Sequence, residues 1–270
     1  MRRRSAESSR DLPIIKLLPN LLTLTAVCAG LTAIRFAFLG EFEWAVRLVL
    51  AAGVLDGLDG RLARLVRSES LVGAELDSLA DFLNFGVAPV LILYTWALQG
   101  AGGLGWIACL CFSLCCLMRL ARFNVDAKHG GKGPMPAEDS APDADAAPAP
   151  AATSRPGDYF VGVPSPAGAI LLLLPMVVSF ALKQPPILPP AALAIYLVVI
   201  GLLMISRIPT YSFTNITVRR DKASFTLLGA VLVAAALLIY LWPTLIILTV
   251  VYVASIAVAL ISRRRTVRKG

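Results

Sequence analysis

The chain has 270 residues, of which 57% are hydrophobic and 16% charged, with a mean hydropathy of +0.76 and a net charge of +8. This composition excludes an ordinary soluble domain, because repeated apolar runs of about 20 residues are typical of membrane spans. The positive charge does not indicate a nucleic-acid partner, since the basic residues cluster beside the apolar runs, as they do on the cytoplasmic side of membrane proteins.

Eight apolar runs follow one another along the chain and predict an all-α fold, a polytopic membrane helical bundle of about eight transmembrane helices. Short breaks rich in glycine or proline separate several of them. The runs cover about 17–39, 43–64, 72–98, 103–123, 162–182, 187–206, 223–241 and 243–262.

The distribution of Lys and Arg supports this count. If the N-terminus lies in the cytoplasm and each span reverses direction, 22 of the 25 Lys and Arg residues fall on the cytoplasmic side. The exceptions are Arg35, Arg47 and Lys183. We therefore expect a multi-pass protein of the cell (inner) membrane, with both termini cytoplasmic and the active site at the cytoplasmic face.

The polar interruptions divide the chain further. The long segment 126–158 is rich in Pro, Ala, Gly and Asp and has too few large apolar residues to form a core, which predicts a disordered cytoplasmic linker. The other expected units are a cytoplasmic N-terminal segment (1–16), a membrane domain in two halves (17–125 and 159–213), a C-terminal helical hairpin (214–262) and a basic cytoplasmic tail (263–270).

Four aspartates interrupt the apolar pattern where the second span ends and the third begins. Asp56 and Asp59 are spaced i, i+3, and Asp77 and Asp81 are spaced i, i+4, so each pair projects from one side of a helix. Four ionised carboxylates in a membrane would cost on the order of 10 kcal/mol if nothing neutralised them. Ligand sets made only of oxygen suit Mg²⁺ or Mn²⁺, and four carboxylates are enough to hold two such ions.

The neighbouring residues extend this interpretation from metal to phosphate. Gly60 and Ala63 keep one helix face low, Arg64 offers a forked cation that fits phosphate oxygens, and Gly73 opens the next helix at the same depth. Together they predict a site for a metal-bound diphosphate. An alternative is a set of aspartates neutralised by arginines in a water-filled cavity, as in a cation transporter.

The spacing Asp56-x-x-Asp59-Gly60-x-x-Ala63-Arg64, eight residues, then Gly73-x-x-x-Asp77-x-x-x-Asp81 resembles the signature of the CDP-alcohol phosphatidyltransferase family at every fixed position. Flanking segments resemble the phosphatidylserine synthase branch of that family. These segments are PNLLTL (19–24), DSLADFLNFGVAPV (77–90), RLARFNV (119–125), FVGVPSPA (160–167) and SRIPTYSF (206–213).

This resemblance implies transfer of a phosphatidyl group from CDP-diacylglycerol to L-serine, in contact with membrane lipids and in a homodimer. It implies that the four aspartates bind two divalent cations, Mg²⁺ or Mn²⁺, and that Asp81 is also the general base. The residues it implies for the CDP-lipid are Asn20, Thr23, Gly60, Ala63, Arg64, Ser70 and Gly73.

The acceptor must be held by groups outside the signature, since the carboxylate of serine requires a cation and its ammonium group an acceptor. The candidate cations, at cytoplasmic span ends, are Arg119, Arg122 and Arg207. The candidate hydrogen-bonding groups are Asn84, Asn124, Ser165 and Tyr211. Each arginine also fits a simple positive-inside anchor. Three alternatives stay open: the same chemistry on glycerol 3-phosphate, inositol phosphate or choline, a cation transporter, and a lipid-binding scaffold without catalysis.

Overall fold

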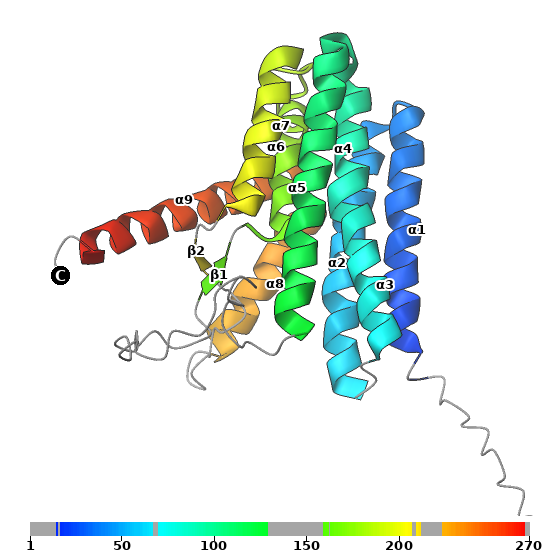
Figure 1. Cartoon of the computed structure of the whole chain (residues 1–270), viewed down its shortest axis with the longest axis vertical. Helices are drawn as coiled ribbons and strands as arrows, with labels where there is room; N and C mark the ends of the chain where they lie inside the picture. The colour runs from blue at the N-terminus through cyan, green and yellow to red at the C-terminus, as the bar shows by residue number, and fades with distance from the viewer. Residues whose placement is uncertain are drawn as a thin grey trace, which may run out of the picture.

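The computed structural model describes residues 15, 17–66, 70–128, 159–161, 163–206, 209–211 and 223–267, and in it helices form a bundle (Figure 1). The first half contains α1 (Leu18–Phe38), α2 (Phe42–Val66), α3 (Leu71–Asp81), η2 (Phe82–Val87), α4 (Ala88–Leu93), η3 (Tyr94–Leu98), η4 (Gln99–Ala101) and α5 (Gly103–Lys128). The second half contains β1 (Tyr159–Val161), α6 (Ser165–Leu182), α7 (Pro190–Ile205), β2 (Pro209–Tyr211), α8 (Ala223–Ile239) and α9 (Leu241–Val267).

The helices coincide with the eight predicted apolar runs to within a few residues at most ends. Four helices in the described part of the chain are long and apolar enough to cross a membrane: Leu18–Phe38, Val72–Ala101, Gly103–Val125 and Ser165–Leu182. Three shorter apolar helices follow, at Pro190–Ile205, Thr226–Ile239 and Leu241–Ile256. The bundle of membrane helices is thus confirmed, whereas the count of eight spans and the side on which the termini lie stay predictions.

Several predicted segments lie wholly or partly outside the described residues. These are most of the N-terminal segment, residues 129–158 of the predicted linker, and the end of the basic tail. The helix α5 continues to Lys128, past the expected start of the linker at residue 126.

Small residues bring α1 and α2 together. The buried face of α1 consists of Pro19, Thr23, Ala26, Gly30, Ala33 and Ala37, which recur every three or four residues. It packs along α2, whose buried residues are also mostly small. Small side chains allow two membrane helices to approach closely, so this stripe fixes α1 beside the aspartates of α2.

The third helical run, from Leu71 to Ala101, changes its hydrogen-bonding pattern along its length. The α-helix gives way to a π-helical segment at Phe82, directly after Asp81, and again at Tyr94. Pro89 lies two residues beyond the end of the first π segment and lacks the N–H that a regular helix would use. Such π segments are frequent at functional sites, and the sequence pattern did not reveal them.

The all-α fold class holds, and one short strand pair accompanies the helices. β1 and β2 form a two-stranded antiparallel pair, with Tyr159 opposite Tyr211 and Val161 opposite Pro209. The strands come directly before α6 and after α7, so their pairing ties together the two ends of this helical hairpin. Segments of three residues are too short for a periodic signal in the sequence.

All four tryptophans lie toward the end of the bundle away from the aspartates, on the first turns of α2 and α5, late in the third helical run and at the start of α9. The guanidinium of Arg47 lies 5.1 Å from the ring of Trp44 and 5.5 Å from that of Trp242. The corner between α8 and α9 therefore lies beside the start of α2. From there α9 runs at a wide angle to the bundle (Figure 1).

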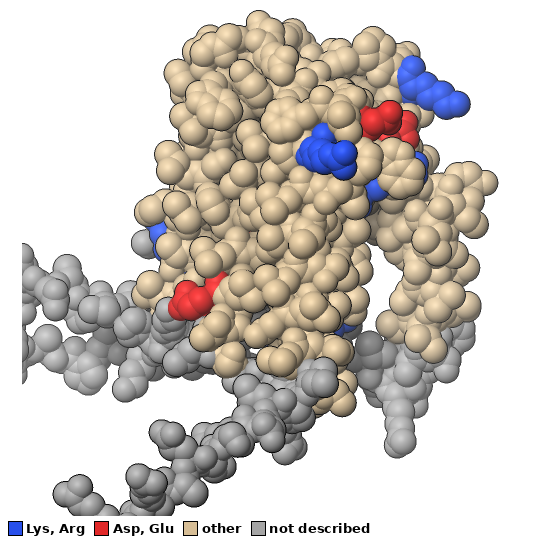
Figure 2. All heavy atoms as spheres, turned by 90° about the vertical axis from the view of Figure 1, so that its right-hand side faces the viewer, with Lys and Arg blue, Asp and Glu red and all other residues tan. Residues whose placement is uncertain are grey.

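The outer surface of the bundle is apolar. On α1, Leu21 is 60% exposed and Phe38 is 69% exposed. Figure 2 shows a face with few charged side chains and a broad uncharged area. Exposed apolar surface on this scale is stable in contact with lipid and unfavourable in water.

Candidate active site

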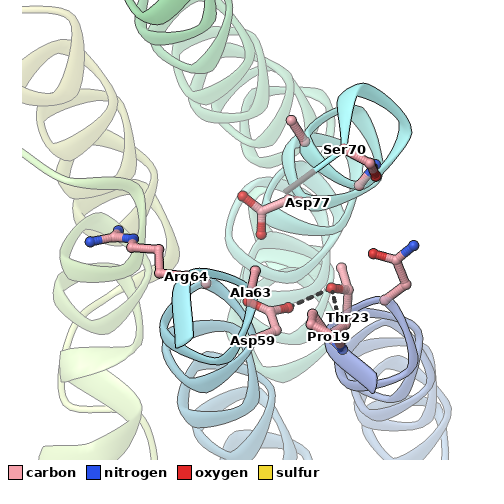
Figure 3. Close-up of a pocket in the computed structure, with 11 residues that line it drawn as sticks. Pro19, Thr23, Asp59, Ala63, Arg64, Ser70 and Asp77 are labelled. Carbon is pink, nitrogen blue, oxygen red and sulfur yellow. Dashed lines mark hydrogen bonds between the residues drawn. The ribbon is translucent and has the colours of Figure 1, made fainter. Parts of the chain in front are cut away.

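The aspartates of α2 and α3 converge where these two helices lie side by side at the end of the bundle. Asp59 on α2 and Asp77 on α3 point toward one another (Figure 3). Asp56, Asp59 and Asp77 each offer a carboxylate oxygen, and these three oxygens all lie within 4.8 Å of one another. The predicted helical faces therefore do meet, and three of the four expected metal ligands form one cluster.

Asp81 lies at the edge of this cluster. The side chain of Asp81, at the end of α3, contacts that of Asp56 on α2. Two carboxylates in contact repel each other unless a proton or a cation lies between them. The contact therefore links the fourth aspartate to the same site of concentrated negative charge.

Nothing basic in the described part of the chain neutralises these groups directly, because no Lys or Arg nitrogen there lies within 4.0 Å of the four carboxylates. The buried Oδ1 atoms of Asp56, Asp59 and Asp81 have no hydrogen-bond partner among the described residues. An ion pair between an arginine and any of these aspartates is thus absent from the described residues. Oxygen atoms that are buried and unpaired in this way fit the ligand requirements of a divalent cation.

One of the four aspartates is oriented by α1. The hydroxyl of Thr23 donates a hydrogen bond of 2.6 Å to Oδ2 of Asp59, and it lies 3.1 Å from the carbonyl oxygen of Pro19. Asp59 is 3% exposed. Because one of its oxygens is held by Thr23, the other is left free for a ligand.

A cavity of about 270 Å³ opens beside the cluster, between α1, α2 and the start of α3 (Figure 3). All seven residues expected to contact a CDP-lipid line it, together with Asp59 and Asp77. The lining is Pro19, Asn20, Thr23, Asp59, Gly60, Ala63, Arg64, Ser70, Gly73, Ala74 and Asp77.

Two of these residues also shape the cavity. Ser70 is the N-cap of α3, where its hydroxyl accepts a 3.0 Å hydrogen bond from the backbone N–H of Gly73. A methyl group on Gly73 would lie 3.0 Å from Oδ1 of Asn20 and 3.0 Å from Oγ of Ser70, so glycine keeps this wall open. By contrast, a methyl group on Gly60 would meet open space, so this position exposes helix backbone to a ligand.

Arg64, the cation expected beside the phosphates, does not point toward the carboxylate cluster. Arg64 is exposed, and its side chain extends away from Asp59 and Asp77 (Figure 3). It lines the cavity without touching the carboxylates.

The family model of the CDP-alcohol phosphatidyltransferases matches residues 16–213, almost three quarters of the chain. The chain belongs to this family. It is similar to proteins named CDP-diacylglycerol–serine O-phosphatidyltransferase, with 36% identity to one from Mycobacterium leprae over 96% of this chain and 80% of that protein. Identity is 32% to one from Mycobacterium bovis (93% and 80%) and 31% to one from Methanocaldococcus jannaschii (72% and 73%).

Among the acceptor contacts expected in this transferase, Arg119 is linked to the aspartates by its charge. It projects from α5, and its Nη1 donates a 2.6 Å hydrogen bond to Oγ of Ser165, the fully buried first residue of α6. Its charge acts on Asp81. The structure thus brings Arg119 and Ser165 together beside the aspartates.

Within the described part of the chain, the structure does not bring the other expected acceptor contacts together with Arg119 and Ser165. Arg122 is exposed and reaches the carbonyl oxygen of Ile205 at 3.5 Å, at the end of α7. Asn124 donates a 2.9 Å hydrogen bond to Ser78 and so ties α5 to α3. Arg207 lies outside the described residues, as does the side chain of Tyr211.

Asn84 is completely buried rather than on a cavity wall. It lies in the π-helical segment after Asp81, and a methyl group on Gly30 of α1 would lie 2.1 Å from its Oδ1. Neither polar atom of its amide has a partner among the described residues. Asn84 is therefore a buried polar contact between the third helical run and α1.

Sequence reasoning missed an apolar cavity of about 630 Å³ between α2, η2, α6, α8 and α9. Its α2 wall ends at Val54, two residues before Asp56, and Phe85 contributes a wall one turn after Asp81. The cavity thus begins where the aspartates end and continues deeper into the bundle. Its walls come from helices distant in sequence, so no local pattern could have indicated it.

Proposed function

We propose that this protein transfers the phosphatidyl group of CDP-diacylglycerol to the hydroxyl of L-serine, which yields phosphatidylserine and CMP. The observation that carries the proposal is the cluster of Asp56, Asp59 and Asp77, two of which, Asp59 and Asp77, line a cavity together with all seven residues expected for a CDP-lipid. The names of these relatives support serine as the acceptor.

Asp56, Asp59, Asp77 and Asp81 are the residues that would hold two divalent cations, Mg²⁺ or Mn²⁺. When bound, such ions neutralise a diphosphate and stabilise the departing CMP. The unpaired Oδ1 atoms of three of these aspartates support this assignment. The cavity residues Asn20, Thr23, Gly60, Ala63, Arg64, Ser70 and Gly73 would surround the CDP portion.

Asp81 is the proposed general base. The serine oxygen forms a bond to the lipid-side phosphorus while the bond from that phosphorus to the CMP oxygen breaks, and Asp81 accepts the hydroxyl proton. The position of Asp81 at the edge of the cluster, with one buried oxygen unpaired among the described residues, suits this role.

The apolar cavity next to the aspartates would receive an acyl chain of the donor lipid. Its walls are almost entirely aliphatic. They are formed by parts of α2 and η2 that lead away from the carboxylates into the bundle, together with α6, α8 and α9. A charged headgroup at one end and hydrocarbon at the other match the two chemically different ends of a phospholipid.

Arg119 is the acceptor contact that the geometry favours, since it is held by Ser165 and its charge acts on Asp81. Arg122 fits the end of α7 instead, where a cation offsets the partial negative charge of the last carbonyl groups. Asn84 and Asn124 would support the site through helix contacts, and Arg207 stays a candidate on sequence grounds.

The charge pattern supports a multi-pass protein of the inner membrane with the aspartates at the cytoplasmic face, where soluble serine and CMP can exchange. We propose a homodimer on the basis of the sequence resemblance.

An assay of acceptor choice tests the function. Purified protein in detergent receives CDP-diacylglycerol with serine, glycerol 3-phosphate, inositol phosphate or choline, and CMP release is measured. Release with serine alone is expected. Release with another alcohol would change the assigned acceptor, and no release with any of them would contradict the transferase proposal.

A further inference from the structure

A second polar cluster lies between α5, α6 and α9, next to Asp81. Its centre is Arg119, which interacts electrostatically both with Asp81 and with Tyr252 of α9. Ser165 holds one end of the guanidinium at 2.6 Å. Tyr252 lies beyond residue 213, where the family match ends.

Two hydrogen-bond donors in this cluster have no acceptor in the part of the chain that the structure describes. Nε of Arg119 and the hydroxyl of Tyr252 are both buried from solvent, and neither has a partner among the residues that the structure describes. A buried donor without a partner is costly, and the cost is greater for a charged group. A neighbouring ligand that accepts hydrogen bonds would satisfy both.

The chemistry of that ligand follows from the donors. A guanidinium and a phenolic hydroxyl both donate, and together they carry one positive charge. A carboxylate has two acceptor oxygens and one negative charge, and arginine pairs with it particularly well. The α-carboxylate of serine has this character, and its hydroxyl would then extend toward Asp81.

We propose that Tyr252 and Arg119 together bind the carboxylate of the acceptor amino acid, so that α9 contributes to acceptor choice. This inference rests on the proposed function. Tyr252 is a substrate-binding residue in it and takes no part in proton transfer, so its loss should weaken serine binding and leave the chemical step intact.

The test compares wild type with Tyr252→Phe, which removes the hydroxyl and keeps the ring. Tyr240→Phe is the matched control, because Tyr240 is 66% exposed at the corner between α8 and α9. CMP release is measured at saturating CDP-diacylglycerol while L-serine is varied, and then with the donor varied. A hydrogen bond to a charged group is worth about a factor of ten or more in binding. Tyr252→Phe should therefore raise the KM for serine about tenfold, with kcat and the KM for the donor within about twofold of wild type.

Ethanolamine, which is serine without its carboxylate, provides a second measurement. Tyr252→Phe should leave kcat/KM for ethanolamine unchanged, so the preference for serine over ethanolamine falls about tenfold. An unchanged KM for serine, or an equal loss with both acceptors, would overturn the inference while serine-dependent release by wild type leaves the proposed function standing. If wild type uses no acceptor that bears a carboxylate, both the inference and the proposed function fail.

Discussion

The hydroxyl of Thr23 donates a 2.6 Å hydrogen bond to Oδ2 of Asp59, which joins α1 to the carboxylate cluster of α2 and α3. Both groups are buried, at 4% and 3% exposure. A partner of this kind fixes the orientation of a metal ligand, and its removal typically weakens metal binding about 10–100-fold.

Thr23→Val should therefore raise the Mg²⁺ or Mn²⁺ concentration that gives half-maximal CMP release by about tenfold. The shape of the side chain is kept, so the melting temperature in detergent should change little. Thr25→Val is the control, because the Thr25 hydroxyl bonds only the carbonyl of Leu21 in its own helix. An unchanged metal requirement in Thr23→Val would contradict a role for Thr23 in orienting Asp59.

Asp81→Asn should lower kcat by about 10²–10⁴-fold, because the amide cannot accept the serine proton. Binding of a CDP-lipid should persist, since the other three aspartates remain. Equilibrium binding of the donor and the rate of CMP release, measured on the same preparation, separate these two effects. Near-normal turnover by this variant would exclude Asp81 as the base.

Removal of divalent cations should both stop the reaction and destabilise the fold. Three carboxylate oxygens within 4.8 Å repel one another when no cation lies among them. Addition of Mg²⁺ to metal-free wild type should thus raise its melting temperature, and Asp59→Asn should reduce that rise. A melting temperature that does not respond to Mg²⁺ in wild type would count against metal binding at this cluster.

Gly30→Ala should destabilise the protein by about 1–3 kcal/mol, because its methyl group would lie 2.1 Å from Oδ1 of buried Asn84. In the double variant Gly30→Ala/Asn84→Ala the side chain at position 84 is shorter, so part of the lost stability should be recovered. The control is Gly229→Ala on exposed α8, where a methyl group meets no atom within 4 Å. Equal melting temperatures for wild type and Gly30→Ala would contradict the close approach of α1 to the third helical run.

Ala234→Trp should partly fill the apolar cavity from its α8 wall. The KM for CDP-diacylglycerol with long acyl chains should then rise several-fold, while a donor with short chains should be affected less. Measurement of KM for both donors, with serine saturating, checks this. An equal effect on both donors would argue against an acyl chain in this cavity.

The helices and the carboxylate cluster were accessible from sequence because their signals are local. Apolar runs ended by glycine or proline give helix bounds, and spacings of three and four residues give the faces of Asp56, Asp59, Asp77 and Asp81. A helical hairpin then suffices to bring these faces together.

The remaining features depend on contacts between distant segments. Tyr252 comes within electrostatic reach of Arg119 only because α9 packs against α6. In the sequence, Tyr252 looks like any tyrosine in an apolar helix. The π-helical segment after Asp81 and the strand pair also depend on packing and backbone bonding that no periodic pattern encodes. Sequence thus identified the aspartates more readily than the groups proposed to choose the acceptor.

The tryptophans mark one end of the bundle and the carboxylates the other, which has a consequence for the bilayer as a whole. A lipid made at the proposed site would enter the leaflet beside the aspartates, and its zwitterionic or charged headgroup would not readily cross the hydrocarbon. Each turnover would therefore exchange one lipid for another within a single monolayer, and the product would need a separate translocation step to reach the opposite one.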